Sequence, residues 1–442
     1  MISAEPQIKV GILDNIHELR GSVDGTFVVD GEHRFTGEFT ARAEHGQIVL
    51  ADIAGKALLS EREISCRNLS GGMFTLRDVP IGIKFHWERK EDQAFEGDLK
   101  LIARSNGTFA AINIIPLEKY LASVISSEMN SGAPVELLKA HAITSRSWLA
   151  AMLAREERNV DVDPERSFRF EGELIRWYDR EDHDLYDVCA DDHCQRYQGT
   201  TKIASTGVGD AVESTRGVFL FYGDKICDAR FSKACGGLTE EYENAWEEMH
   251  VPYLETVPDS AVKHPIIANE QMAEDWILSN PDAYCNITDV DLLKRVLPSF
   301  DQDTTNFFRW GIEYAREELE EIVAAKSGID FGTLRNLVPL QRGPSGRICR
   351  LRIEGSKKTM IVGKELEIRR WLSKTHLYSS AFVVMAEREE DGTPKRFMFY
   401  GAGWGHGVGL CQIGAAVMAS KGFSAEEIVR HYYRKAEIRK VY

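Results

Sequence analysis

Residues 116–134, "PLEKYLASVISSEMNSGAP", mark the point where the chain changes from strand to helix. Pro116 suits the first turn of a helix, where a backbone N–H has no partner in any case. A second helix should begin near Pro134, so the two segments predict a helical hairpin. Apolar side chains follow at spacings of three and four residues, the pattern of one buried helix face: Leu117, Tyr120, Leu121, Val124 and Ile125.

The same apolar stripe, extended by one turn, reaches Glu128 in "ISSEMN". A carboxyl group on the buried face of a helix is expensive to ionise, so it can keep its proton and donate it near neutral pH. We interpret Glu128 as a candidate general acid. The alternative is a glutamate at a helix end that turns to solvent or pairs with Lys139 or Arg146.

Strand-rich and helix-rich stretches flank this hairpin. Residues 7–115 contain short β-branched and aromatic runs separated by Gly, Asp and Asn, which predict a β-rich layer. Helical periodicity returns within 262–340 and in "SAEEIVRHYYRK", where Ser424 and Glu427 form a capping-box pattern. The expected fold class is α+β: a β-rich core with a catalytic helical hairpin and a helical insertion or subdomain.

A glycine-rich stretch lies near the C-terminus, "GAGWGHGVGLCQIGAA" at residues 401–416. Glycine serves where the backbone takes left-handed angles or approaches another group closely. The spacing does not match the phosphate-binding glycine motifs. We therefore expect a ligand-lining loop around Trp404 and His406, and the alternative is a glycine-rich crossing of two strands.

Soft metal ligands are concentrated in "HDLYDVCADDHC", residues 183–194. His183, Cys189 and Cys194, with His193 beside them, are the mixture of donors that holds zinc. The H-x5-C-x4-C spacing differs from the close pairs of zinc fingers. A structural zinc therefore competes with a disulfide and with two structural thiols, and Cys235 is a possible partner in either case.

Composition narrows the class of protein. The 442 residues carry 54 Lys and Arg against 69 Asp and Glu, a net charge of −15 without a basic block, which argues against nucleic acid as a partner. No apolar run is long enough to cross a bilayer. The opening "MISAEPQIKVGIL" lacks the pattern of an export signal, so a cytoplasmic location is open.

Several motifs together resemble the stage II sporulation protein D family (SpoIID/LytB). The helical signature is "IPLEKYLASVISSEMNSGAPVELLKAHAITSRSWLA" and the C-terminal one is "GWGHGVGLCQIGA", with "ARFSKACGGLTE" and "VPYLETVPD" between them. The resemblance spans residues 95–260 and 345–442. It implies four regions: a β-rich region at 1–95, the first part of the core at 96–260, a helical insertion at 261–344, and the rest of the core at 345–442.

The resemblance implies a peptidoglycan lytic transglycosylase that cuts between N-acetylmuramic acid and N-acetylglucosamine and leaves 1,6-anhydromuramyl ends. Glu128 takes the place of the catalytic acid. Family members called amidase enhancers assist a cell-wall amidase, and the family's substrate lies outside the cytoplasm. Expected substrate-binding residues are Arg146, Ser232, Trp404, His406 and Gln412.

One carboxyl group is sufficient for such a reaction, whereas an ordinary glycosidase needs two. The muramyl C6 hydroxyl attacks its own anomeric carbon, so the same group first donates and then collects a proton. Two other readings remain: a glycan-binding amidase enhancer without catalysis, and a cysteine amidase that uses Cys411 and His406. Cys411 stands where the family often has Ser.

Overall fold

The computed structural model describes residues 4–31, 33–82, 88–156, 167–178, 183–191, 194–302 and 304–442. The chain forms two compact units. Unit 1 comprises Met1–Arg146, Arg180–Val218 and Lys440–Tyr442, and unit 2 comprises Ser147–Asp179 and Phe219–Arg439. Among the helices of the described ranges, none has both the length and the apolar character that a membrane span requires.

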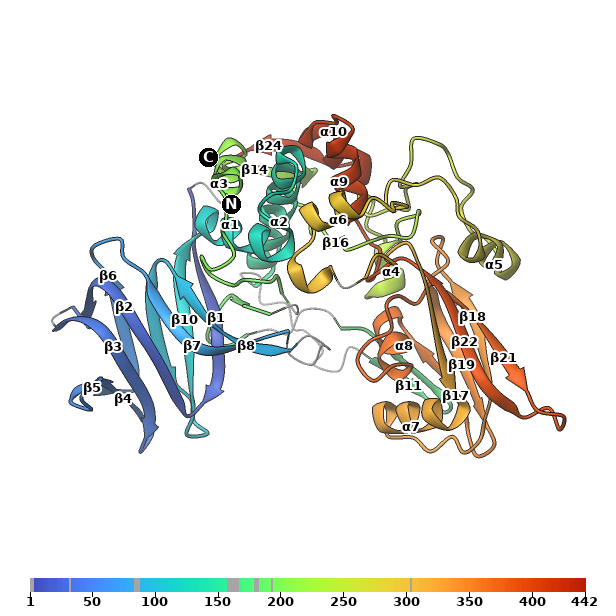
Figure 1. Ribbon diagram of the computed structural model, residues 1–442, viewed down its shortest axis with the longest axis horizontal. Coiled ribbons are helices and arrows are strands. Elements are labelled where there is room, and N and C mark those ends of the chain that lie inside the picture. The colour runs from blue at the N-terminus through green and yellow to red at the C-terminus, as the bar shows by residue number, and fades with distance from the viewer. Residues whose placement is uncertain are drawn as a thin grey trace. The chain divides into compact units, whose positions relative to one another are not determined.

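Unit 1 is built on one large, mostly antiparallel sheet, which confirms the β-rich layer expected from residues 7–115 (Figure 1). The strand order is β13-β1-β10-β9-β6-β2-β3-β4-β5, and β7 pairs with both β2 and β8. The strands are β1 (Gln7–Ile16), β2 (Glu18–Val29), β3 (His33–Glu44), β4 (Gln47–Asp52), β5 (Ala57–Glu61), β6 (Glu63–Asn68), β7 (Phe74–Ile81), β8 (Arg89–Phe95), β9 (Asp98–Ala103), β10 (Phe109–Pro116) and β13 (Val188–Cys189).

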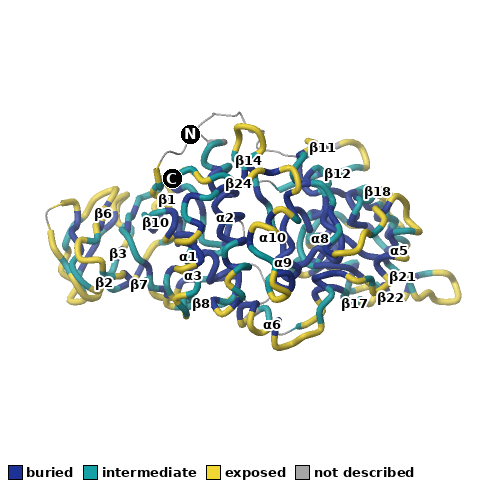
Figure 2. The backbone as a smooth tube through the Cα atoms, turned by 90° about the horizontal axis from the view of Figure 1, so that it is seen from above, coloured by how far each residue is buried: buried dark blue, intermediate teal, exposed yellow. Residues whose placement is uncertain are grey.

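Helices α1 (Leu117–Glu128) and α2 (Val135–Glu156) follow β10 directly, as the sequence predicts. The predicted stripe of α1, from Leu117 to Ile125, is buried (Figure 2). The main helix partner of α1 is α3 (Thr206–Ser214), not α2. The two helices α1 and α2 are therefore consecutive in the chain, as expected, but α1 packs mainly on α3 and not on α2.

Unit 2 contains smaller sheets around a separate apolar core that includes Trp371, Phe382 and Phe399. One sheet has the order β11-β12-β20-β19-β18, another β17-β22-β21, and β16 pairs with β23. The strands are β11 (Ser167–Phe170), β12 (Glu173–Arg176), β16 (Phe231–Ser232), β17 (Arg309–Ala315), β18 (Leu334–Arg342), β19 (Ile348–Gly355), β20 (Thr359–Gly363), β21 (Phe382–Arg388), β22 (Pro394–Ala402) and β23 (Leu410–Cys411). A further sheet joins β14 (Val218–Tyr222), β15 (Lys225–Ile226) and β24 (Glu437–Lys440).

The segment 261–344, expected to be a helical insertion, contributes both helices and strands to unit 2. Its helical runs are present as α5 (Glu270–Leu278), α6 (Val290–Val296) and α7 (Arg316–Ser327), with the 3₁₀ turn η1 (Ser299–Asp301). It also supplies β17 and β18, which pair along their length with β22 and β19. Two of its strands are therefore integral to sheets formed with residues beyond 344.

Unit 2 also contains α4 (Tyr242–Ala245), α8 (Glu365–Trp371) and α9 (Gln412–Ser420). The C-terminal helix α10 (Ala425–Tyr432) begins at the predicted capping box. The Ser424 side chain accepts the backbone N–H of Glu427, and the Glu427 carboxylate accepts the N–H of Ser424. Mixed sheets and helices confirm the α+β class.

Candidate functional site

Glu128 is the last residue of α1 and lies in unit 1. Its side chain is largely buried, with 9% of its surface exposed. One carboxylate oxygen, Oε1, accepts the backbone N–H of Arg196 at 3.2 Å. The helix thus presents the carboxyl group to the segment 195–198, which follows the cysteine-rich stretch.

Segment 195–198 is fixed against α1 by several contacts. The N–H of Gln198 donates to Ser127 Oγ at 3.2 Å, and the Tyr120 hydroxyl donates to Gln195 at 3.2 Å. The Tyr197 ring stacks on Tyr120 with ring centroids 5.2 Å apart. These contacts hold the surroundings of Glu128 in place. Sequence analysis missed this segment, because nothing local in "QRYQ" indicates that it folds onto α1.

His183, Cys189 and Cys194 come together in unit 1, as the sequence predicts for a metal site. Their donor atoms all lie within 4.8 Å of one another, and His183 Nε2 is 3.5 Å from Cys194 Sγ. Zinc–ligand distances of about 2.05 Å to nitrogen and 2.3 Å to sulfur, at a tetrahedral angle, place those two atoms about 3.6 Å apart. The three residues therefore fit one zinc ion. His193 lies outside the described residues.

Tyr120 connects this group to Glu128. Burial raises the pKa of the Tyr120 hydroxyl well above its usual value, and negative charge on Cys194, Cys189 and Glu128 acts in the same direction. All three groups are thus near one phenol. The candidate metal ligands and the candidate acid belong to the same region of unit 1.

Arg146, expected to contact substrate, is in the interior of unit 1. Its guanidinium is fully buried and forms a two-pronged ion pair with Glu118, at 3.1 Å from Nε to Oε1 and 2.6 Å from Nη2 to Oε2. A further N–H donates to the carbonyl of Val218 at 3.1 Å. Because no part of this side chain reaches the surface, a structural role fits Arg146 better than the expected contact with glycan.

The glycine loop between β22 and β23 belongs to unit 2 and is fixed by backbone hydrogen bonds. Trp404 and Ala234 exchange two of them, at 2.7 and 3.1 Å, and the N–H of Gly405 donates to the carbonyl of Tyr378 at 2.8 Å. Arg347 donates two N–H groups to the carbonyl of Gly405. Arg347 is 58 residues away in the chain, and sequence analysis did not identify it.

The alternation of glycines has a backbone cause. Gly403, Gly405, Gly407 and Gly409 all have φ between 75° and 92°, a region that other residues rarely adopt. At Gly407 a Cβ atom would also overlap the guanidinium of Arg347. The loop therefore crosses between two strands and keeps Trp404 and His406 partly exposed, and its contact with a ligand stays a prediction.

His406 is held by the backbone on its Nδ1 side. The N–H of Val408 donates to Nδ1 at 3.0 Å, so the neutral ring carries its proton on Nε2, where it can act only as a donor. Burial, together with the positive charges of Arg230, Arg347 and Arg369, lowers the pKa of His406 well below its usual value. The ring stays neutral at physiological pH.

The other expected contact residues of unit 2 differ in exposure. Trp404 is partly exposed and stacks on Tyr378 with ring centroids 4.0 Å apart. Ser232 is buried, yet its Oγ has no hydrogen-bond partner among the described residues. Gln412 is almost completely buried at the start of α9. Trp404, His406 and Ser232 thus remain candidates for ligand contact.

The geometry does not support a cysteine amidase. Cys411 is fully buried, and its Sγ accepts the N–H groups of Cys235 and Gly414 at 3.3 and 3.4 Å. A nucleophilic cysteine must be accessible and must donate its proton to an adjacent base. His406 offers no free Nδ1 acceptor for that proton, so this reading is set aside.

We expect Gly407→Ala to destabilise unit 2 by roughly 1–3 kcal/mol from backbone strain alone, with a further loss because the new methyl group displaces Arg347. Urea denaturation followed by tryptophan fluorescence measures this. The control is Gly422→Ala, where φ is 91° but the position is open, so strain acts without overlap. Equal losses for the two variants would contradict the assigned role of Arg347.

Comparison with known families finds two domains. A match to Stage II sporulation protein covers residues 105–222, which include Glu128 and the three candidate metal ligands. A match to Domain of unknown function (DUF8618) covers residues 240–409, which include most of the glycine loop. The segment 261–344 lies entirely inside this second match.

Comparison with individual proteins agrees with the match to Stage II sporulation protein. Stage II sporulation protein D of Bacillus subtilis (strain 168) is 25% identical over 389 residues, 87% of this chain and 87% of the relative. Its counterpart in Bacillus amyloliquefaciens is 25% identical over 334 residues, 74% of this chain and 75% of the relative. Amidase enhancer of Bacillus subtilis (strain 168) is 24% identical over 248 residues, 52% of this chain and 32% of the relative. The chain therefore contains a Stage II sporulation protein domain at residues 105–222 and, over most of its length, is similar to stage II sporulation protein D.

Proposed function

We propose that the protein is a peptidoglycan lytic transglycosylase that cleaves the bond between N-acetylmuramic acid and N-acetylglucosamine and leaves 1,6-anhydromuramyl ends. The observation that carries the proposal is the placement of Glu128. It is a largely buried carboxyl group on a rigid helix end, inside the sporulation-protein match. The relatives support a function connected with the cell wall.

Glu128 performs both proton transfers in this proposal. The carboxyl group first protonates the glycosidic oxygen as the bond to the anomeric carbon breaks. The resulting carboxylate then takes the proton of the muramyl C6 hydroxyl as that oxygen attacks the anomeric carbon. The Arg196 N–H on Oε1 stabilises the carboxylate that forms once the proton has been donated. No water is consumed, because the new bond between O6 and the anomeric carbon replaces the glycosidic bond that breaks.

Trp404 and His406 are proposed to contact the glycan through the glycine loop. A partly exposed indole offers an apolar face, and the neutral His406 ring beside it is held in place by the backbone of Val408 and Phe231. Ser232 Oγ is a buried hydroxyl that a ligand group can satisfy. Intact cell wall lies outside the cytoplasmic membrane, so action on it requires export of the protein.

A product assay tests the proposal. Purified protein is incubated with glycan strands freed of stem peptides, and separately with strands that keep them. Mass spectrometry should detect anhydromuramyl ends, which are lighter by one water than the products of hydrolysis. Reducing ends without the anhydro bridge would indicate a hydrolase, and unchanged strands would contradict both activities.

The second candidate function is stimulation of a cell-wall amidase, which the similarity to Amidase enhancer supports. Such a protein would bind glycan without cutting it. It would accelerate peptide release by a separate amidase equally well with Glu128→Gln. The same strands, with an amidase added, distinguish the two candidates.

We further propose that His183, Cys189 and Cys194 bind a zinc ion. When bound, the ion would stabilise the segment beside Glu128, and three protein ligands would leave one coordination position open. Cys189→Ser is expected to lower the zinc content by about one ion per chain, because the thiolate supplies one of only three protein ligands. Elemental analysis of protein purified without added metal measures this. Cys66→Ser changes a buried thiol outside this group and should keep the wild-type zinc content. Equal zinc in both variants would contradict the site.

A further inference from the structure

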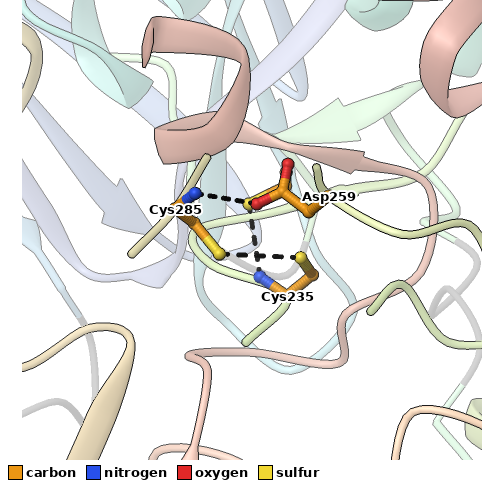
Figure 3. A group of neighbouring side chains, drawn as sticks. Cys235, Asp259 and Cys285 are labelled. Carbon is orange, nitrogen blue, oxygen red and sulfur yellow. Dashed lines mark hydrogen bonds between the residues drawn. The ribbon is translucent and has the colours of Figure 1, made fainter. Parts of the chain in front are cut away.

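Unit 2 contains a second group of potential metal ligands, which no sequence motif indicated. Cys235, Asp259, Cys285 and Cys411 come from four separate segments, and their donor atoms all lie within 4.8 Å of one another. All four side chains are buried. Figure 3 shows Cys235, Asp259 and Cys285 pointing toward one another.

The spacing of the sulfur atoms matches a single metal ion. Cys235 Sγ and Cys285 Sγ are 3.8 Å apart. Two thiolates bound to zinc at about 2.3 Å and at a tetrahedral angle are also about 3.8 Å apart. A disulfide would need about 2.05 Å between the same atoms. The observed distance fits two ligands of one ion and is too long for a disulfide.

Surrounding groups orient the four ligands. The N–H groups of Cys235 and Gly414 donate to Cys411 Sγ, which lies at the N-terminus of α9. The N–H of Cys285 donates to Asp259 Oδ2 at 2.9 Å, and the Tyr432 hydroxyl donates to Oδ1 at 2.6 Å. Hydrogen bonds of this kind to ligand atoms fix their orientation and are typical of built metal sites.

The charge around the group also favours a cation. Among the described residues, no Lys, Arg or His forms an ion pair with Asp259, although its carboxyl group is fully buried between three cysteines. A buried carboxylate needs a positive partner. The partly buried guanidinium of Arg309 donates to backbone carbonyls, including that of Gly236, and its charge interacts with Cys235 and Cys285. It can offset part of the negative charge that remains on a zinc ion with four anionic ligands.

We propose that Cys235, Asp259, Cys285 and Cys411 bind one divalent metal ion, with zinc as the best match, in a closed structural site. Thiolates select zinc over magnesium or calcium, and four protein ligands leave no open position for catalysis. Cys411 ends the glycine loop, and Cys235 follows Ala234, the backbone partner of Trp404. The ion therefore fixes both sides of the loop that carries Trp404 and His406.

The test separates this site from the one in unit 1. The double variant Cys189→Ser/Cys194→Ser removes two ligands of the unit 1 group and leaves the unit 2 group intact. Elemental analysis of this variant, purified without added metal and under reducing conditions, should still find about one zinc ion per chain. Adding Cys411→Ser should remove that ion, whereas adding Cys227→Ser, a buried thiol outside both groups, should not.

If the Cys411→Ser variant does not fold, a spectroscopic measurement still tests the proposal. The double variant is stripped of zinc and reloaded with Co²⁺, whose tetrahedral thiolate complexes absorb strongly through sulfur-to-cobalt charge transfer. That absorption should appear and then disappear when zinc is added. A double variant that binds neither zinc nor Co²⁺, or a Cys235–Cys285 disulfide found by mass spectrometry, would overturn the proposal.

Discussion

Glu128→Gln should lower the rate of glycan cleavage by about 10²–10⁴-fold, the contribution expected of a positioned general acid. Gln keeps the shape of the side chain and an oxygen that accepts the Arg196 N–H, so the surroundings of residue 128 are preserved. It cannot donate a proton to the leaving oxygen or collect one from the C6 hydroxyl. The rate of formation of anhydromuramyl ends, followed by mass spectrometry, measures the effect.

The matched control for this variant is Glu136→Gln. Glu136 lies in the first turn of α2 and pairs with Lys139 at 2.8 Å, with about a third of its side chain exposed. Both variants replace one carboxyl group of unit 1 by an amide, and only Glu128→Gln should lose activity. Similar activity for wild type and Glu128→Gln, with intact folding by circular dichroism, would remove Glu128 from the mechanism. Glycan cleavage would then depend on another group of the protein.

Local periodicity explains why the burial of Glu128 could be predicted from the sequence, while its role as the acid stays a prediction. The stripe from Leu117 to Ile125 continues for one turn to Glu128, and a helix keeps this register because its geometry is regular. The capping box at Ser424 and Glu427 was predictable for the same reason, since both partners lie within one turn. Features that depend on residues three or four apart were identified correctly.

Features that depend on distant segments could not be predicted in this way. Arg146 occupies a position in the family signature that suggested substrate contact, but its partner Glu118 lies 28 residues away on another helix. The group of Cys235, Cys285 and Cys411 spans 176 residues and has no recurrent spacing. Such contacts result from tertiary packing, for which a single sequence contains no local signal.

The buried ion pair itself provides a second large effect: Arg146→Met should destabilise unit 1 by about 3–5 kcal/mol, because it leaves the Glu118 carboxylate buried without its cation. The N–H of Gly217 and the Tyr442 hydroxyl would still donate to Glu118 Oε1, but neither carries a charge. Urea denaturation at pH 7 measures the loss. Arg146→Met/Glu118→Gln should recover part of it, since the second change removes the unpaired charge.

This double-mutant cycle also decides between the two roles considered for Arg146. A structural ion pair gives a coupling free energy of about 0.5–3 kcal/mol between Arg146 and Glu118, and the double variant then regains glycan cleavage along with stability. KM for glycan strands should stay near the wild-type value under conditions where the variants are folded, because a fully buried guanidinium cannot bind substrate. If instead the double variant is stable but KM remains strongly raised, Arg146 contacts the glycan in a conformation that opens the interior of unit 1.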